Sequence, residues 1–479
     1  MARYKKGEDR QQISLLPMCL EDMIPDDAEV RALEVIVDRM DICSLEFTYG
    51  TTKQTGRMPY DPVDMFKLYA YSYFNGIRSS RKIERECGRN IELMWLIGSL
   101  KPDFKTIADF RKKNKRQIRT AFQRFGAICG ELGLIGREIV AVDGSKFRAN
   151  NSRLRYHSRK KIEEKIKHYA ENADMYMKLL DSCDQEESIQ PKLSKDEIIK
   201  KLDHINTRLV ELTLLKEQVI QKGNIYETDP DSRMMKMNNN GCDICHNVQI
   251  VVDDKKHMVV AVDVTSQPVD KEQLYSMAAQ AKENMAADTL TVIADKGYYS
   301  AKQFEKCEKA NITAIVSKAD HSNAAASEEY SKDMFAYDEN SDTYICLQGQ
   351  VLKRRQSREN SKYKDYPSYS NQIACGLCPI PAKDKCTRGK YRTIINQPLH
   401  EYARVVDART KVNMPIYNQR KQLVEHPFGT IKRGFGFSYF LTRGNENVRT
   451  ESALHFLVYN MKRAMNIVGT TELRAALQA

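Results

Sequence analysis

The segment IVAVDGS at residues 139–145 is the part of the sequence from which the fold can be argued. Its apolar, β-branched residues lead directly to Asp143, and the segment LTVIADKGY at 290–298 repeats the pattern around Asp295. Short apolar runs bounded by glycine are typical of buried strands. A carboxylate at the point where such a strand meets its loop is a common catalytic or metal-binding group. The two segments predict strands of an α/β sheet that bring both aspartates to one rim.

A third carboxylate stands in the sequence YNQRKQLVEHPFGTIK, which starts at Tyr417 and ends at Lys432. It reads as a helix as far as Glu425, which shares a helix face with Tyr417. Arg420 and Lys432 put positive charge close to Glu425, and Pro427 is expected to bend or end the helix. Taken by itself, a glutamate among cations is usually no more than a surface ion pair.

The three carboxylates are more informative when they are considered together. Asp143, Asp295 and Glu425 could meet at one rim of the sheet. Divalent cations that prefer oxygen ligands need such a carboxylate cluster. Two cations held there can clamp both oxygens of a phosphoryl transfer. The pattern therefore favours a metal-dependent site for phosphodiester chemistry.

Several longer motifs surround these carboxylates, and they occur in order over nearly the whole chain. They are VDGSKFRANNS (142–152), NVQIVVD (247–253), ADKGYYS (294–300), VEHPFGTIKR (424–433) and the segment 56–96. With these motifs the sequence resembles the DDE transposases of bacterial insertion sequences, in the branch called the insertion-sequence eleven-eighty-two type. The motifs are specific together and weak alone. One spacing departs from the related pattern, because four residues separate Arg420 from Glu425 where three are usual, while the spacing from Glu425 to Lys432 fits.

The resemblance implies a ribonuclease-H-like α/β catalytic core and a DNA transposase. Two Mg²⁺ ions, or Mn²⁺, held by Asp143, Asp295 and Glu425 would activate water for attack on the phosphodiester at a transposon end. The freed 3′-OH would then attack target DNA. Lys296 follows Asp295 and could help to hold the DNA end, or could simply belong to the local turn. Contacts with the phosphate backbone near the cut are expected from Lys432, Tyr417 and Arg420.

The resemblance also implies partners, and it leaves other classes of protein open. Double-stranded DNA is expected as transposon ends and as target, with further copies of the chain in a synaptic complex. A nuclease of the same fold would hydrolyse DNA without joining it. A domesticated, non-catalytic DNA-binding protein is the other alternative, although the presence of all three carboxylates argues against it.

The composition agrees with a large, basic, globular protein. The 479 residues are too many for one core, so two or more domains are expected. A net charge of +12 favours a polyanionic partner such as nucleic acid. The first residues lack the apolar segment of a signal peptide, and no apolar run approaches membrane-spanning length. Together with 12 cysteines, which suggest reduced thiols, these features predict a cytoplasmic, nucleoid-associated protein.

Residues 1–135 read as an all-helical domain with recurring basic residues. A helix–turn–helix module that binds DNA ends has this appearance, and so does a helical bundle with a solvated basic face. The resemblance favours DNA-end binding. The residues assigned to this contact are Arg78, Arg81, Lys82 and Arg85.

The rest of the chain divides into a catalytic core and two insertions. Residues 153–225 are charged and helical and predict an inserted hairpin, which contacts DNA or a second protomer or serves as a packing spacer. Residues 320–399 form a polar insertion that contains cysteines, and residues 466–479 form a C-terminal helix or tail. The segments expected to build the core are 136–152, 226–319 and 400–465.

The second insertion holds a candidate zinc site. Cys375 and Cys378 have the spacing of a zinc ligand pair, Cys386 follows, and Cys346 precedes them. A segment with so few apolar residues needs a staple to fold. Free cysteines in a loop, or disulfides formed after purification, are the alternatives.

Overall fold

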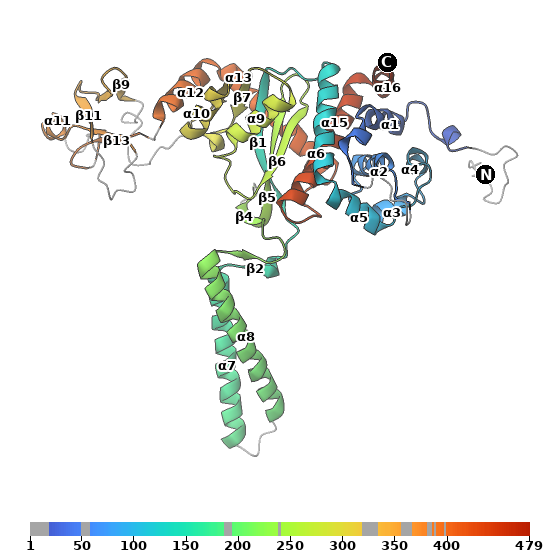
Figure 1. Cartoon of the computed structure of the whole chain (residues 1–479). Coiled ribbons are helices and arrows are strands. Elements are labelled where there is room, and N and C mark those ends of the chain that lie inside the picture. Colours follow the sequence, from blue (N-terminus) through green and yellow to red (C-terminus); the bar gives the residue numbers. More distant parts are fainter. Residues whose placement is uncertain are drawn as a thin grey trace, which may run out of the picture.

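The computed structural model describes residues 19–48, 58–185, 194–237, 241–318, 334–355, 366–380, 386–387, 389–396 and 399–479. A mixed sheet lies at the centre, with helices on both sides, a long hairpin below it and a small second sheet beyond it (Figure 1). No helix of the described residues is long and apolar enough to cross a membrane.

The central sheet has six strands. Its order is β6–β5–β1–β7–β8, and β4 pairs with the first part of β5 on the side where β6 also pairs. β5 runs antiparallel to β1 and β6, whereas β7 and β8 run parallel to β1. This arrangement is compatible with a ribonuclease-H-like core. The strands are β1 (Ile139–Arg148), β4 (Arg233–Lys236), β5 (Cys242–Asp253), β6 (Val259–Thr265), β7 (Leu290–Ala294) and β8 (Ile312–Val316).

The register of the parallel strands positions the two aspartates. Val142 lies opposite Ala294 in the β1–β7 pair, so the next residues, Asp143 and Asp295, stand at the same level. Asp295 directly follows β7, whereas β1 does not end at Asp143 as the sequence predicted but continues beside β5 to Arg148. The strands are buried on both faces because helices cover them, as the unbroken apolar runs predict. The helices near this sheet include α9 (Leu274–Asn284), α10 (Ala301–Lys309), α12 (His400–Val412), α13 (Met414–Asn418) and α14 (Arg420–Gly429).

The N-terminal helices are not a separate body. The helix α15 (Asn445–Val468) is buried along most of its length and packs on N-terminal helices and on β6 at once. As a result one apolar core runs from the helices into the sheet. The boundary predicted at residue 135 falls between α6 and β1, but it divides no core. The N-terminal helices are α1 (Glu29–Arg39), α2 (Pro62–Phe74), α3 (Ser80–Glu86), α4 (Ile91–Leu96), α5 (Phe104–Lys113) and α6 (Lys115–Glu131).

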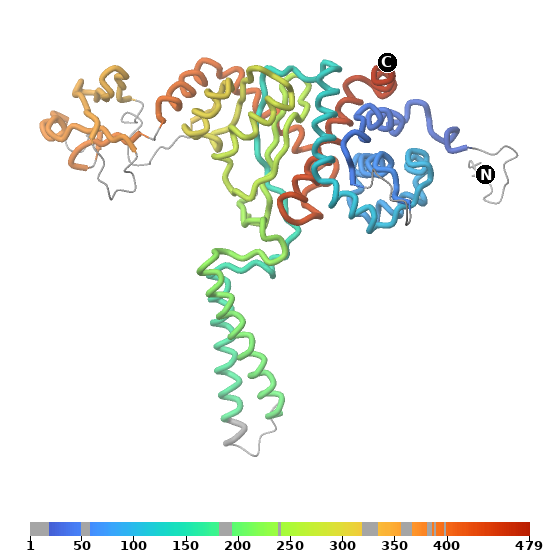
Figure 2. Tube along the Cα trace, in the orientation of Figure 1, coloured from blue at the N-terminus to red at the C-terminus, as the bar shows by residue number. Residues whose placement is uncertain are grey.

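The C-terminal segment is a docked helix. α16 (Thr470–Gln478) packs against α1, and Arg474 donates a hydrogen bond to the carbonyl of Asp26. Figure 2 shows α16, the last helix, beside α1. The segment therefore joins the N-terminal helices to the rest of the core.

The first insertion forms the hairpin that the sequence predicts. It consists of α7 (Arg159–Gln185) and α8 (Lys195–Lys222), which lie antiparallel and project from the sheet (Figure 1). A short ladder of β2 (Tyr156–His157) and β3 (Ile225–Tyr226) closes its base. Buried residues seven positions apart form the α8 seam, as in a coiled coil: Ile198, Ile205, Leu212 and Val219.

The second insertion folds around a small sheet of its own. The strand order is β13–β12–β11–β10–β9, and only five buried apolar residues form its core cluster. Arg404 of α12 ties it to the main body through an ion pair with Glu339 and by stacking over Tyr337. Its elements are β9 (Ala336–Asp338), β10 (Thr343–Ile345), β11 (Val351–Arg355), β12 (Ser368–Ser370), α11 (Gln372–Gly376) and β13 (Thr393–Ile395).

Candidate active site and nucleic-acid contacts

Asp295 lies close enough to Asp143 to act on the charge of its carboxyl group. Burial and then the charge of Asp295 raise the pKa of the Asp143 carboxyl from 3.8 to about 6. The Gly144 N–H and the Arg420 guanidinium act in the opposite direction. The sheet therefore holds two carboxylates together with only part of their repulsion compensated, an arrangement that is common at functional sites.

The turn after β7 fixes the second aspartate. Asp295 caps the short helical turn η4 (Lys296–Tyr298), and its carboxylate accepts a hydrogen bond of 2.8 Å from the Gly297 N–H. A side chain at position 297 would come within 2.9 Å of that carboxylate, so the glycine allows the close approach. Lys296 is exposed and points away from the sheet.

A third aspartate stands beside this pair, and sequence reasoning missed it. Asp270 lies between β6 and α9, and its charge also raises the pKa of Asp143. It accepts hydrogen bonds from Asn247 at 2.6 Å and Gln249 at 2.7 Å, and it forms an ion pair with Lys146 at 3.2 Å. The sequence feature that could have indicated this network is on β5, where two polar residues alternate with apolar ones.

Gly144 makes this network possible. A Cβ at this position would come within 2.2 Å of the Gln249 amide nitrogen and 2.7 Å of the Asp270 carboxylate. The Tyr298 hydroxyl donates to Gln249 from the other side. Gly144 is thus required so that polar side chains can pack against the backbone next to Asp143.

Glu425 lies on α14 and is exposed. Pro427 was predicted to bend or end the helix, but α14 continues to Gly429 and leads into a π-helical turn, η7 (Thr430–Gly434). Pro427 and Phe428 are buried, and packing against the core holds the helix despite the proline. Among the described residues, no three His, Cys, Asp or Glu side chains converge closely enough to hold a metal ion. Glu425 therefore lies on a neighbouring helix, and its side chain does not converge with those of the two aspartates.

Lys432 is not placed as a free, phosphate-binding lysine would be, because its ammonium is bound within the protein. Its ammonium donates to the Ser145 hydroxyl at 2.7 Å and the Lys146 carbonyl at 2.9 Å, and it lies over the Phe147 ring. Burial lowers the pKa of Lys432 to about 8. The lysine ties the Glu425 segment to β1 just after Asp143.

The two other residues expected near the cut lie on the same side of the molecule. Arg420 begins α14, and its charge reaches Asp143. Tyr417 lies near the end of α13 and packs, partly buried, on the main core. Of the two, Arg420 is the residue whose charge acts on Asp143.

The basic residues of the N-terminal helices divide into two groups. Arg78 is buried, forms an ion pair with the fully buried Glu451, and lies over the rings of Phe437 and Tyr439. This placement corrects the prediction for Arg78, since its guanidinium joins the N-terminal helices to the core and is not available to DNA. The exposed basic residues of the α3 segment form what we call the α3 basic face: Arg81, Lys82 and Arg85.

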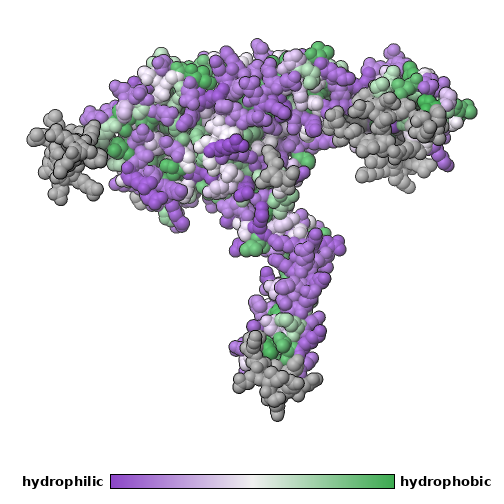
Figure 3. Space-filling view, turned by 180° about the vertical axis from the view of Figure 1, so that it is seen from behind, coloured by the Kyte–Doolittle hydropathy of each residue, from purple (hydrophilic) through white to green (hydrophobic). Residues whose placement is uncertain are grey.

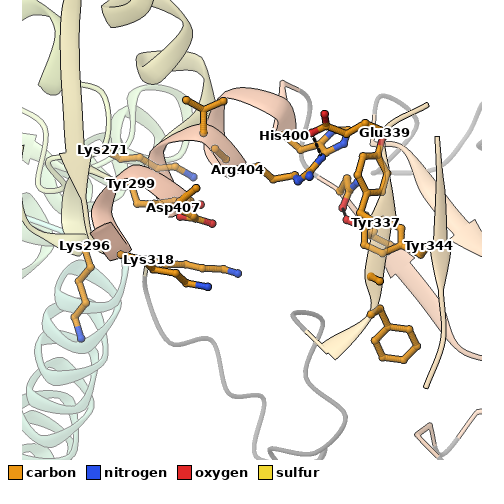
Figure 4. A pocket seen from close by; sticks show the side chains of 18 of the residues that line it. Lys271, Lys296, Tyr299, Lys318, Tyr337, Glu339, Tyr344, His400, Arg404 and Asp407 are labelled. Carbon is orange, nitrogen blue, oxygen red and sulfur yellow. Dashed lines mark hydrogen bonds and ion pairs between the residues drawn. The ribbon is translucent and has the colours of Figure 1, made fainter. Parts of the chain in front are cut away.

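A cleft of about 910 Å³ separates the core from the second insertion (Figure 4). It begins at Lys296 and Gly297, directly after Asp295, and α12 forms its floor. Lysines and tyrosines line it, and Tyr299 donates to Asp407 within it. Three lysines of the cleft form no ion pair with any other residue that the structure describes: Lys271, Lys296 and Lys411. The cleft therefore carries a positive surface next to the aspartate pair.

The four cysteines of the second insertion line one cavity of about 300 Å³. All four are free thiols of intermediate exposure. Burial raises the pKa of the Cys386 thiol, the Arg392 guanidinium opposes this shift, and the other three thiols add to it. The thiols of Cys346, Cys375 and Cys378 are thus close enough to Cys386 to affect its charge.

Comparisons with known proteins agree with this geometry. Residues 18–113 match the family described as "Transposase domain (DUF772)", and residues 227–461 match "Transposase DDE domain". A search of curated proteins found no match. A cryo-EM structure of the piggyBac transposase synaptic complex with hairpin DNA is similar at 9% identity and a TM-score of 0.32, covering 94% of this chain and 79% of that one, which is too weak to support an argument. The two family matches cover most of the chain between them, and they show that it is a DDE transposase, an enzyme of DNA transposition.

Proposed function

We propose that this transposase binds the ends of an insertion sequence of the eleven-eighty-two type, cleaves the DNA there and joins the 3′-OH to target DNA. Asp143, Asp295 and Glu425 are its catalytic carboxylates. The observation that carries the proposal is the placement of Asp143 and Asp295 at the same level on the adjacent parallel strands β1 and β7, with the pKa of Asp143 raised to about 6. The strand order, with β1 at the centre and β5 antiparallel beside it, supports a ribonuclease-H-like core for this chemistry.

The paired carboxylates fit a divalent cation. Two like charges at one partly buried site are costly unless a cation compensates them, and their oxygen ligands suit Mg²⁺ or Mn²⁺. Asp143 and Asp295 would hold the cation, and Glu425 of α14 is the proposed third ligand. Such a cation supplies charge stabilisation to the attacking and leaving oxygens of the phosphodiester.

The surrounding residues position this site. Lys432 fixes the end of β1 through the Ser145 hydroxyl and the Lys146 carbonyl. Asp270 and Gln249 hold the backbone at Gly144 from the other face. Arg420 offers a guanidinium to a phosphate oxygen held at Asp143. These contacts would keep the catalytic carboxylates in place while the DNA strand is exchanged.

DNA would meet the protein on two surfaces. The α3 basic face is exposed and suits the duplex of a transposon end. The cleft lies beside Asp295, and its volume is typical of ligand pockets (about 300–1,000 Å³), so it has room for part of one strand and not for a duplex. The strand that leaves the cut therefore runs between the core and the second insertion.

A salt titration tests the strand path. Lys271→Ala with Lys411→Ala should reduce the salt dependence of binding to an end with an unpaired flank by about 0.7 per lost phosphate contact. Lys255→Ala with Lys256→Ala is the control, since these exposed lysines lie in the turn at the opposite end of β5. Equal salt slopes for both double variants would exclude the cleft as the strand path.

The hairpin is the proposed contact with a second protomer. Its surface is mainly hydrophilic, with apolar side chains near the free end (Figure 3). Met175, Met177 and Ile199 are each exposed by more than two fifths there. Glutamate at Met177 and Ile199 should shift the protein to a smaller assembly on end DNA, as measured by light scattering. An unchanged mass would place the protomer contact elsewhere.

Product analysis distinguishes the transposase from a nuclease of the same fold. Purified protein, Mg²⁺, a labelled duplex carrying the element's end and a target plasmid are incubated together. We expect labelled ends covalently joined to the plasmid. Cleaved ends without any joined product would instead establish a nuclease.

A further inference from the structure

The cysteines of the second insertion come from two tight turns that face the same cavity. Cys346 stands in the turn between β10 and β11, where its N–H donates to the Gln350 carbonyl at 2.9 Å and its carbonyl accepts from Gly349 at 2.8 Å. Gly349 has a φ of +70°, which favours glycine. This turn presents the thiol on a rigid backbone.

Two further thiols, those of Cys375 and Cys378, are held at the end of α11. Asn371 caps this helix by accepting from the Ala374 N–H at 3.0 Å, and its amide donates to the Val351 carbonyl at 2.9 Å. The latter bond ties the helix to β11, next to the turn that carries Cys346. Cys375 and Cys378 therefore face that turn, and all four thiols line the 300 Å³ cavity between them.

In the part of the insertion that the structure describes, the sheet around the cavity has only a small apolar core. Its core cluster consists of Phe335, Tyr344, Leu352, Tyr369 and Ile394, and Cys346 and Cys386 pack against this cluster. Its strands are three to five residues long. Small domains with so little buried apolar surface usually depend on a metal or disulfides, and these cysteines form no disulfide.

We propose that Cys346, Cys375, Cys378 and Cys386 bind one structural Zn²⁺ ion. Four thiolates are the ligand set that zinc takes in closed structural sites. In this structure the thiols share a cavity wall without converging, and zinc–sulfur bonds of about 2.3 Å would draw the two turns together. Arg392 lies next to the site, bonded to the Cys386 carbonyl at 3.2 Å, and offsets part of the thiolate charge.

Metal analysis of the full chain tests the site. Protein purified under reducing conditions, without a metal-affinity tag, should contain about one zinc per chain. Cys375→Ser with Cys378→Ser should lose it. Cys242→Ser with Cys245→Ser is the matched control, because this pair has the same spacing but lies on the strand β5, where residues three apart face opposite sides.

A second measurement keeps the proposal testable if the Cys375, Cys378 variant does not fold. Wild-type protein stripped of metal and loaded with Co²⁺ should develop the intense thiolate-to-cobalt absorption of a four-sulfur site. Zinc retained by the Cys242, Cys245 control and lost with the other pair would support the proposal. Folded wild-type protein without zinc and without that cobalt absorption would overturn it, as would zinc loss in both double variants. Strand cleavage is not the readout, so either result is independent of the transposition chemistry.

Discussion

Replacing Asp143 with asparagine should stabilise the metal-free protein at neutral pH. The folded protein holds the Asp143 proton with a pKa of about 6, against 3.8 for an unperturbed carboxyl. A raised folded-state pKa means that the stability contribution is full below pH 3.8 and is lost as the pH rises through 6. The loss amounts to at most about 3 kcal/mol at 1.36 kcal/mol per pKa unit. Asparagine has a similar shape and no charge, so Asp143→Asn avoids that loss.

The assay is urea unfolding at several pH values in the presence of a chelator, followed by far-ultraviolet circular dichroism. The gain of the variant over wild type should be near zero at pH 4 and grow to at most about 3 kcal/mol at pH 7.5. Asp288 is exposed just before β7, and Asp288→Asn is the control that should show no such growth. A gain independent of pH, or a variant less stable than wild type at pH 7.5, would refute the electrostatic argument. Added Mg²⁺ should stabilise wild type more than the variant, since only wild type retains both carboxylates.

Three further outcomes follow from the structure. Arg78→Ala should destabilise the protein by about 3–5 kcal/mol in thermal or urea unfolding, because it leaves the buried Glu451 without its guanidinium; an unchanged stability with weaker DNA binding would restore the DNA-contact assignment. Alanine at all positions of the α3 basic face should lower the slope of end-binding affinity against salt by about 0.9 per lost phosphate contact, and an unchanged slope would remove that face from the interface. Gly144→Ala should abolish strand cleavage while end binding persists, since its Cβ would displace Gln249, whereas Gly126→Ala, which meets no neighbour, should be neutral; equal cleavage by both variants would contradict the role given to Gly144.

The strand patterns predicted the aspartate pair because the signal is local. A short apolar run that leads to an Asp indicates a strand, and parallel pairing then brings Asp143 and Asp295 to one level. The run did not predict that β1 continues past Asp143 to Arg148. The hairpin of 153–225 could be predicted for the same reason, since its seam repeats along the sequence. The sequence did not mark Asp270, which reaches Asp143 from a loop with no regular pattern.

Contacts between distant segments could not be predicted from the sequence. In the sequence, Arg78 cannot be distinguished from its exposed basic neighbours. It contacts Tyr439, which lies 361 residues later in the chain. Lys432 likewise meets Ser145 across 287 residues. The packing of the N-terminal helices on the sheet depends on the same kind of contact, because the helix α15 that joins both parts of the core lies near the end of the chain. Local periodicity carries no information about which charged residue a distant helix will bury.

The central claim is that Asp143, Asp295 and Glu425 act together in cutting DNA. The measurement that tests it is strand cleavage of a labelled end duplex in Mg²⁺ by full-length Asp143→Ala, Asp295→Ala and Glu425→Ala, with Asp288→Ala as control and end binding measured on each protein. We expect cleavage to be lost in all three variants while end binding is kept, and to be normal in the control. Cleavage near the wild-type rate by any of the three would contradict the assignment of that carboxylate.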